Sequence, residues 1–207
     1  MTARLGAAIV ALIAALGCGL LGSSVSEAPP AGVDVAGRAL AGEWPHVALV
    51  FTASCLWYVL VAFGIAAIVL AVLRPAWRAR VTFALITTLV AWQASDAAKN
   101  IFMRERPRYW ILIHETSWSY PSGHAMFAIV VYGLWSYYAA TSDAPPLLRR
   151  GLSAAIALWG IGVLWSRLAL GAHFLTDLTG GVLFGITMLA IATAIAGGIP
   201  RLRRTAR

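Results

Sequence analysis

Six long apolar blocks limit how this chain can fold. They lie near residues 5–21, 46–73, 81–98, 124–140, 152–165 and 178–199. An α-helix rises about 1.5 Å per residue, so about 20 apolar residues cross a hydrocarbon layer roughly 30 Å thick. The blocks reach or approach that length, and the shortest, 152–165, is expected to continue toward Arg167. The sequence therefore predicts an all-α integral membrane bundle of about six transmembrane helices, forming a single domain over residues 1–207.

The composition favours a membrane protein over a soluble one. The chain is 60% hydrophobic and only 12% charged, whereas about a quarter of the residues of a soluble domain are charged. The net charge of +8 does not indicate nucleic-acid binding, because the arginines stand in short clusters between apolar blocks. We therefore expect membrane lipids, and no nucleic acid, as partners. Cys18 and Cys55 lie in apolar runs and indicate neither a disulfide framework nor a zinc site. No oligomeric state is predicted.

The charged residues are divided unevenly between the two sides of the predicted bundle. One side carries ten arginines and a single acid, Asp143, for a net charge of +9, and the other carries six basic and seven acidic residues, for −1. Positive loops stay in the cytoplasm, so we expect both termini there, in the inner membrane of a bacterium. The first block follows Arg4 and fits either a retained helix or a cleavable signal peptide, and its length favours the helix.

Three polar clusters fall on the side predicted to face the periplasm or the exterior. They are Lys99 with Arg106-Pro107, then Pro121-Ser122-Gly123-His124, then Ser166-Arg167 with His173 and Asp177. Lys99 and Arg106 are seven residues apart and would share a face if helix continues that far. The second cluster opens the fourth block, where free backbone N–H groups suit an anion. His173 and Asp177 are four apart, so on a helix the carboxylate lies beside the imidazole and could orient it.

Each cluster taken alone also has an ordinary structural explanation. Lys99 and Arg106 could be interfacial anchors, and Pro-Ser-Gly is common where a loop enters a helix. The His173–Asp177 pair could be a satisfied polar contact or a proton relay. Their joint occurrence, with eleven residue types at set spacings on one side of the membrane, favours an active site.

Together the clusters resemble the three-part motif of the type 2 phosphatidic acid phosphatases, which share their site with the vanadium haloperoxidases. The motif reads Lys-x6-Arg-Pro, Pro-Ser-Gly-His and Ser-Arg-x5-His-x3-Asp, and this sequence departs from it at none of those positions. By motif the resemblance covers residues 99–177, and the layout of six apolar blocks extends it to the whole chain.

The resemblance implies a role for each motif residue. His173 would attack phosphorus and become phosphorylated, with Asp177 orienting it, and His124 would protonate the leaving oxygen and later activate water. The implied phosphate-binding residues are Lys99, Arg106, Ser122, Gly123 and Arg167. No carboxylate cluster indicates a metal site, so we expect metal-independent catalysis without a cofactor. Nearby, Arg108, His114 and Glu115 could select a headgroup, but solvated loop residues are the favoured interpretation.

The implied function is hydrolysis of a lipid phosphate monoester or pyrophosphate through a phosphohistidine intermediate. Undecaprenyl pyrophosphate and phosphatidylglycerophosphate are the candidate substrates. A lipid phosphotransferase that uses a prenyl pyrophosphate donor would need the same site. A transporter with a polar pathway belongs to another class; it would need charges at mid-span, and the apolar blocks are almost free of them.

Overall fold

The computed structural model describes residues 2–30, 32–109, 112 and 114–200, and within these ranges the regular structure is entirely helical. The helices are α1 (Thr2–Val25), α2 (Val33–Gly37), α3 (Pro45–Ala53), α4 (Trp57–Leu73), α5 (Arg78–Phe102), α6 (Gly123–Phe127), α7 (Leu134–Ala140), α8 (Pro146–Ala169) and α9 (Leu175–Ala196). A π-helical segment, Ala128–Gly133, joins α6 to α7, and short 3-10 turns cover Arg38–Leu40 and Pro75–Trp77. The all-α prediction is confirmed for the described chain.

Not every predicted apolar block forms one long apolar helix. Among the described residues, α1, α8 and α9 are long and apolar enough to cross a membrane, and α3 with α4, bent by 47° at their break, could form a fourth span. The predicted block 81–98 lies within α5, where Gln93, Ser95 and Asp96 lower the hydropathy. The block 124–140 is divided among α6, the π-helical segment and α7, each of which is short. The count of six remains a prediction.

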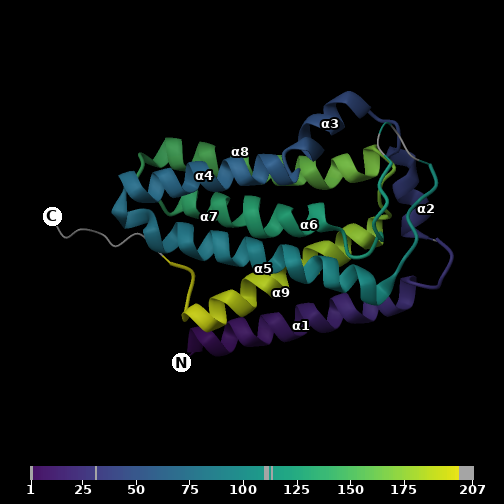
Figure 1. Ribbon diagram of the computed structural model, residues 1–207, viewed down its shortest axis with the longest axis horizontal. Coiled ribbons are helices and arrows are strands. Elements are labelled where there is room, and N and C mark those ends of the chain that lie inside the picture. Colours follow the sequence, from purple (N-terminus) through teal and green to yellow (C-terminus); the bar gives the residue numbers. More distant parts are fainter. Residues whose placement is uncertain (1, 31, 110–111, 113, 201–207) are drawn as a thin grey trace.

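The helices form an elongated bundle, and different helices meet at its two ends (Figure 1). Figure 1 shows α1 running along α9 at one edge of the bundle and α8 lying at the other. The start of α1 and the end of α9 meet at one end, where Arg4 lies beside Gly197. The short helices α2 and α6 lie at the opposite end (Figure 1). Four of the arginines counted above lie in residues 201–207, outside the described residues.

Local signals at the end that holds α2 and α6 stop and start the helices that meet there. Helix α5 ends at Phe102 because Met103 adopts a left-handed conformation with φ 46°. Helix α6 begins after Ser122, whose side chain accepts a hydrogen bond from the Ala125 N–H. Helix α9 begins after Phe174, whose N–H donates to the Asp177 carboxylate. These three boundaries place polar residues of separate helices at the same level.

Small residues let α6 and α9 approach until their backbones nearly touch. A Cβ atom added to Gly181 would lie 2.3 Å from the Ser122 carbonyl oxygen and 2.7 Å from the Ala125 Cβ. The neighbouring Gly180 is equally close to the Tyr120 ring, with 2.2 Å to the nearest ring atom. The Ser122 N–H donates to the Asp177 carbonyl oxygen at 3.1 Å across the same contact. The start of α6 is therefore fastened directly to the first turn of α9.

This contact predicts that Gly181→Ala destabilises the protein. The new methyl group meets a backbone carbonyl that cannot rotate away, and overpacking of this kind costs about 1–3 kcal/mol. Gly151→Ala in α8 is the matched control, because nothing lies within 4 Å of its added Cβ. Thermal unfolding in detergent should show a lower Tm for Gly181→Ala and an unchanged or slightly higher one for the control. Equal Tm values for the two variants would contradict the close α6–α9 contact.

Candidate active site

All eight residues of the predicted site lie at one end of the bundle. Two of the phosphate-binding candidates stand at helix ends, with Lys99 in the last turn of α5 and Arg167 in the last turn of α8. Ser122 caps α6 and is followed by Gly123 and His124. The remaining three are Arg106 after α5, His173 in the turn between α8 and α9, and Asp177 in the first turn of α9. Four helix termini thus converge on one site.

The local geometry differs from the helical spacing used to predict it. Lys99 and Arg106 do not share a helix face, because α5 ends before Arg106. They are brought together instead by Ser117, whose hydroxyl accepts from Lys99 Nζ at 3.3 Å and from Arg106 Nη2 at 2.9 Å. His173 is likewise not helical and precedes the start of α9. It meets Asp177 because the carboxylate folds back over the first residues of that helix.

The hydrogen bonds of His173 define which ring nitrogen is free to react. Arg106 Nη1 lies 2.9 Å from Nε2, and because a guanidinium can only donate, Nε2 must carry the lone pair. The proton then resides on Nδ1, which lies 3.4 Å from Asp177 Oδ2 and 3.3 Å from Ser119 Oγ. The unprotonated Nε2 therefore faces the basic side chains, and Asp177 lies behind the ring.

Electrostatics keep His173 neutral. Burial lowers the pKa of His173 well below its ordinary value, and the positive charges of Arg106 and Arg167 lower it further. Only 2% of the residue is exposed. A neutral imidazole with a free lone pair is the form that a nucleophile requires.

The second predicted histidine, His124, has a free nitrogen. Its Nε2 is buried and has no hydrogen-bond partner among the described residues. A buried polar atom without a partner is uncommon and calls for an explanation. His124 interacts electrostatically with Glu115, Arg167 and Lys99, so it belongs to the same cluster. A ligand atom placed between these cations would lie near this nitrogen.

The two arginines of the site are held rigidly. The Arg106 guanidinium donates to the carbonyl oxygens of Ser117 and Ala172, at 2.6 and 2.9 Å. Arg167 is fully buried, and its Nη1 donates to Thr52 Oγ1 at 2.7 Å. Fixed guanidinium groups of this kind are suited to planar or tetrahedral oxyanions.

Glu115 occupies the space between these arginines. Its Oε2 lies 3.2 Å from Arg106 Nη2, and its Oε1 forms a close ion pair with Arg167 Nη2. Burial alone would raise the pKa of Glu115, but the charges of Arg167 and Arg106 outweigh it and hold the pKa below its ordinary range. The favoured interpretation of Glu115 as a solvated loop residue is therefore wrong. The same interpretation is correct for Arg108, because its side chain is 87% exposed and pairs with Glu105.

Sequence reasoning also missed three residues that surround Asp177. Arg104 and Ser119 both donate to its carboxylate, and Asp34 of α2 pairs with Arg104. Arg104 stands inside the six-residue gap of the first motif, where no residue type is specified, and Asp34 lies in a connection read only as a loop. For Arg104 and Asp34 the only available signal was that both charged residues fall on the same predicted side as the motifs, and for Ser119 there was none.

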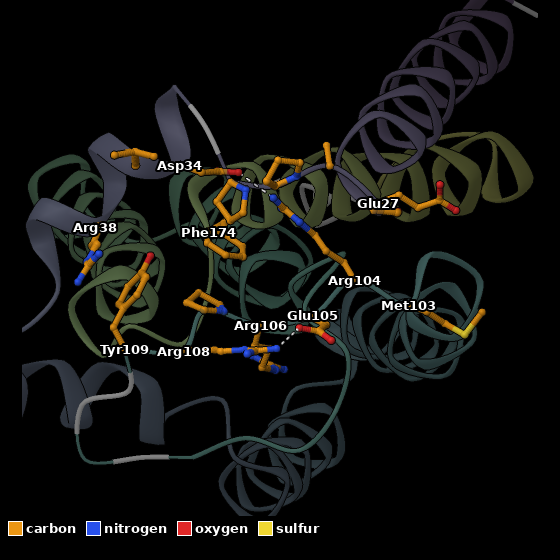
Figure 2. A pocket seen from close by; sticks show the side chains of 16 residues that line it. Glu27, Asp34, Arg38, Met103, Arg104, Glu105, Arg106, Arg108, Tyr109 and Phe174 are labelled. Carbon is orange, nitrogen blue, oxygen red and sulfur yellow. Dashed lines mark hydrogen bonds and ion pairs between the residues drawn. The ribbon is translucent and has the colours of Figure 1, made fainter.

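A cavity of about 600 Å³ opens beside Arg106. Figure 2 shows Arg38 with Tyr109 on one side of it, Met103 and Glu27 on the other, and Arg104 reaching toward Asp34. Its lining combines acidic, basic and aromatic side chains. Within the described chain no group of three or more His, Cys, Asp and Glu residues could hold a metal ion. Of the predicted phosphate-binding cations, Arg106 lines this cavity, and Lys99 and Arg167 lie outside its lining.

Comparison with known proteins gives a matching family model and several relatives. The model of the PAP2 superfamily matches residues 55–199. The chain is 36% identical over 108 residues to the phosphatidylglycerophosphatase B of Bacillus subtilis (strain 168), covering 51% of this chain and 53% of the relative. It is 41% identical over 83 residues to the protein of the same name from Escherichia coli (strain K12), covering 40% and 30%. The chain thus matches about half or less of the length of these relatives.

The fold also has a counterpart among solved structures. It superposes on the crystal structure of a transmembrane PAP2 type phosphatidylglycerolphosphate phosphatase from Bacillus subtilis with a TM-score of 0.71. The superposition covers 98% of this chain and 100% of the other, at 23% sequence identity. At that identity the likeness establishes the shared fold.

The position of Glu115 predicts that it competes with anions for the site. Glu115→Gln removes the negative charge from the two arginines and keeps the size of the side chain. Orthovanadate should then bind roughly tenfold more tightly, because a hydrogen bond to a charged group is worth about 1.5 kcal/mol and tenfold corresponds to about 1.4 kcal/mol. Calorimetric titration of the purified protein in detergent measures this. Glu105→Gln, which changes an exposed pair, should leave the Kd unaltered. Unchanged or weaker vanadate binding by Glu115→Gln would refute competition.

Proposed function

The chain belongs to the PAP2 superfamily, and on that premise we propose that it is an integral membrane phosphatase that hydrolyses a phosphate monoester or pyrophosphate on a lipid. The observation that carries the proposal is the environment of His173 Nε2. This nitrogen is unprotonated, and it faces a buried guanidinium at 2.9 Å. A phosphoryl group placed here would meet a nucleophile and a set of cations at once.

The proposed reaction has two steps. His173 Nε2 attacks phosphorus, the bond from phosphorus to the leaving oxygen breaks, and His124 gives that oxygen a proton. Water then attacks the phosphohistidine, His124 takes its proton, and the P–N bond breaks to release phosphate. During the first step Arg106 Nη1 exchanges its hydrogen bond with Nε2 for one with a phosphoryl oxygen. Asp177 holds the Nδ1 proton and stabilises the positive charge that develops on the ring.

The remaining motif residues would hold the transferred group. Lys99, Arg106 and Arg167 supply positive charge, and the Ser122 hydroxyl and Gly123 amide add neutral donors at the start of α6. Three fixed cations offset the charge that a metal ion would otherwise neutralise, so we infer that the reaction is metal-independent.

The relatives support a phospholipid substrate. Both carry the name phosphatidylglycerophosphatase B, which makes phosphatidylglycerophosphate our first candidate substrate and undecaprenyl pyrophosphate the second. The site lies at one end of helices that are apolar enough to cross a membrane. A lipid could therefore keep its chains in the bilayer while its phosphate reaches His173. We also infer, from the charge difference between the two ends, that the termini are cytoplasmic and the site faces the periplasm or exterior of a bacterial inner membrane.

The substrate class is tested by comparing a lipid with a soluble phosphate. Each buried CH₂ of a lipid chain contributes about 0.8 kcal/mol of apolar binding, so kcat/KM for long-chain phosphatidylglycerophosphate should exceed that for p-nitrophenyl phosphate by at least about a hundredfold in the same detergent. His173→Ala should lower kcat below about a thousandth of wild type, because it removes the nucleophile. Equal kcat/KM values would rule out a lipid phosphatase, and retained turnover by His173→Ala would rule out the phosphohistidine.

Metal independence is tested by chelation. Phosphate release in excess EDTA should stay within about twofold of the untreated rate, because the proposed charge stabilisation comes from side chains. Orthovanadate, which can adopt five-coordinate geometry, should inhibit under the same conditions. Loss of activity in EDTA with rescue by magnesium would contradict the mechanism.

A further inference from the structure

Asp177 is held by more groups than its pairing with His173 requires. The residue is fully buried. Its Oδ1 accepts from Arg104 Nη1 at 2.6 Å, and its Oδ2 accepts from Ser119 Oγ at 2.5 Å and from the Phe174 N–H at 2.9 Å. His173 Nδ1 is the most distant partner, at 3.4 Å. The orientation of the carboxylate is therefore set by groups other than the histidine it faces.

Arg104 is the charged member of this set, and it binds two carboxylates. Its Nη1 contacts Asp177, while its Nη2 lies 2.7 Å from Asp34 Oδ2. Only 4% of its side chain is exposed. The guanidinium also lies over the Phe174 ring, 4.5 Å from the centroid. Arg104 thus contacts both Asp177 and the residue that directly follows His173.

Asp34 fixes this arginine from the far side. It comes from α2, which lies outside the region 55–199 that matches the family model. Its Oδ1 accepts from the Thr176 N–H at 2.9 Å, so the same carboxylate also binds the first turn of α9. Figure 2 shows Arg104 extending toward Asp34, with Phe174 beside them in the lining of the cavity.

The charges of these residues alternate along one line. His173 gains positive charge when it attacks, Asp177 is negative, Arg104 is positive and Asp34 is negative. A buried carboxylate without a cation is strongly unfavourable, so Arg104 keeps Asp177 in its charged form. The positive charge of Arg104 alone would disfavour the positive charge that develops on His173. Asp34 offsets this repulsion because its carboxylate neutralises Arg104. Arg104 and Asp34 together keep Asp177 negatively charged and oriented toward His173 Nδ1.

We propose that Arg104 and Asp34 are positioning residues for the nucleophile: Arg104 orients Asp177 toward His173 Nδ1, and Asp34 holds Arg104 in place. This inference rests on the proposed function for its kinetic consequences. It also implies that α2 completes the active site from outside the region that carries the motifs. Ser119 shares the task through its hydrogen bond to the other carboxylate oxygen.

Kinetics of four variants test the proposal. Arg104→Gln should lower kcat by about a hundredfold, and Asp34→Asn by about tenfold, since partners that orient a reacting group typically contribute effects of this size. KM for the lipid and the Kd of orthovanadate should stay within about threefold of wild type, because neither residue contacts the phosphate-binding arginines. Arg104→Lys, which keeps the charge, should recover at least about tenfold of the loss. The exposed Arg108→Gln is the matched control and should behave as wild type.

A spectroscopic readout makes the result independent of the proposed function. Nitrogen-15 NMR of histidine-labelled protein in detergent reports the ring tautomer, and comparison with His173→Ala assigns the resonances of His173. Wild type should show the Nδ1-protonated form, which Arg106 favours at Nε2 and the Asp177 carboxylate favours at Nδ1. Arg104→Gln, in which the carboxylate turns away and only Arg106 still favours this form, should show a mixture of both tautomers. An inactive wild-type protein with this tautomer change would refute the phosphatase and keep the positioning role. An unchanged tautomer and a kcat within threefold of wild type would overturn the inference. If Arg104→Gln fails to fold, as judged by its Tm, Asp34→Asn and Arg104→Lys decide by the same criteria.

Discussion

Charge compensation between buried arginines and carboxylates holds one end of this protein together. Arg104, Arg106 and Arg167 are all buried, and each is paired with an acid. Removing one partner of a buried ion pair typically costs about 3–5 kcal/mol. The acids differ, however, in how they are held. Asp34 and Asp177 are buried within the bundle, whereas Glu115 comes from a connecting segment and its side chain is 24% exposed. The pairs of Arg104 with Asp34 and Asp177 are therefore part of the packed bundle. The Glu115 carboxylate occupies a position where an anion could replace it.

The close approach of α6 to α9 makes this arrangement possible. Gly181 admits the Ser122 carbonyl, and the Ser122 N–H bonds back to the Asp177 carbonyl oxygen. These contacts bring the segment that carries His124 to the turn that carries His173. A side chain at Gly181 would separate the two histidines by pushing the helices apart. The proximity of the two histidines therefore depends on the absence of a side chain at Gly181, which lets the Ser122 carbonyl and the Ala125 Cβ approach the backbone of α9.

Much of the fold and site could be predicted because the signals are local. The apolar blocks located the helices, since each block alone carries enough hydrophobic length. The motifs gave eight candidate site residues, and the bundle gathers all of them at one end. The prediction was less accurate where it assumed helical geometry. Arg106 and His173 both lie outside helices. Arg106 is linked to Lys99 by the Ser117 hydroxyl, and His173 meets Asp177 because that carboxylate folds back over the start of α9. Neither of these contacts could be predicted from the spacing of residues in the sequence.

What the sequence determined by itself is the helical class and the set of candidate reactive groups, because both depend on residues that are near neighbours in the chain. Only the tertiary structure decided how the charges are paired. Asp34 and Arg104 are 70 residues apart, and Glu115 and Arg167 are 52 apart. No periodicity links such positions, so their pairing follows from the way α2, α8 and α9 pack. Desolvation at that packed end favours a negatively charged partner for each buried arginine, which is why Glu115, expected to be a solvated loop residue, lies between Arg106 and Arg167 instead.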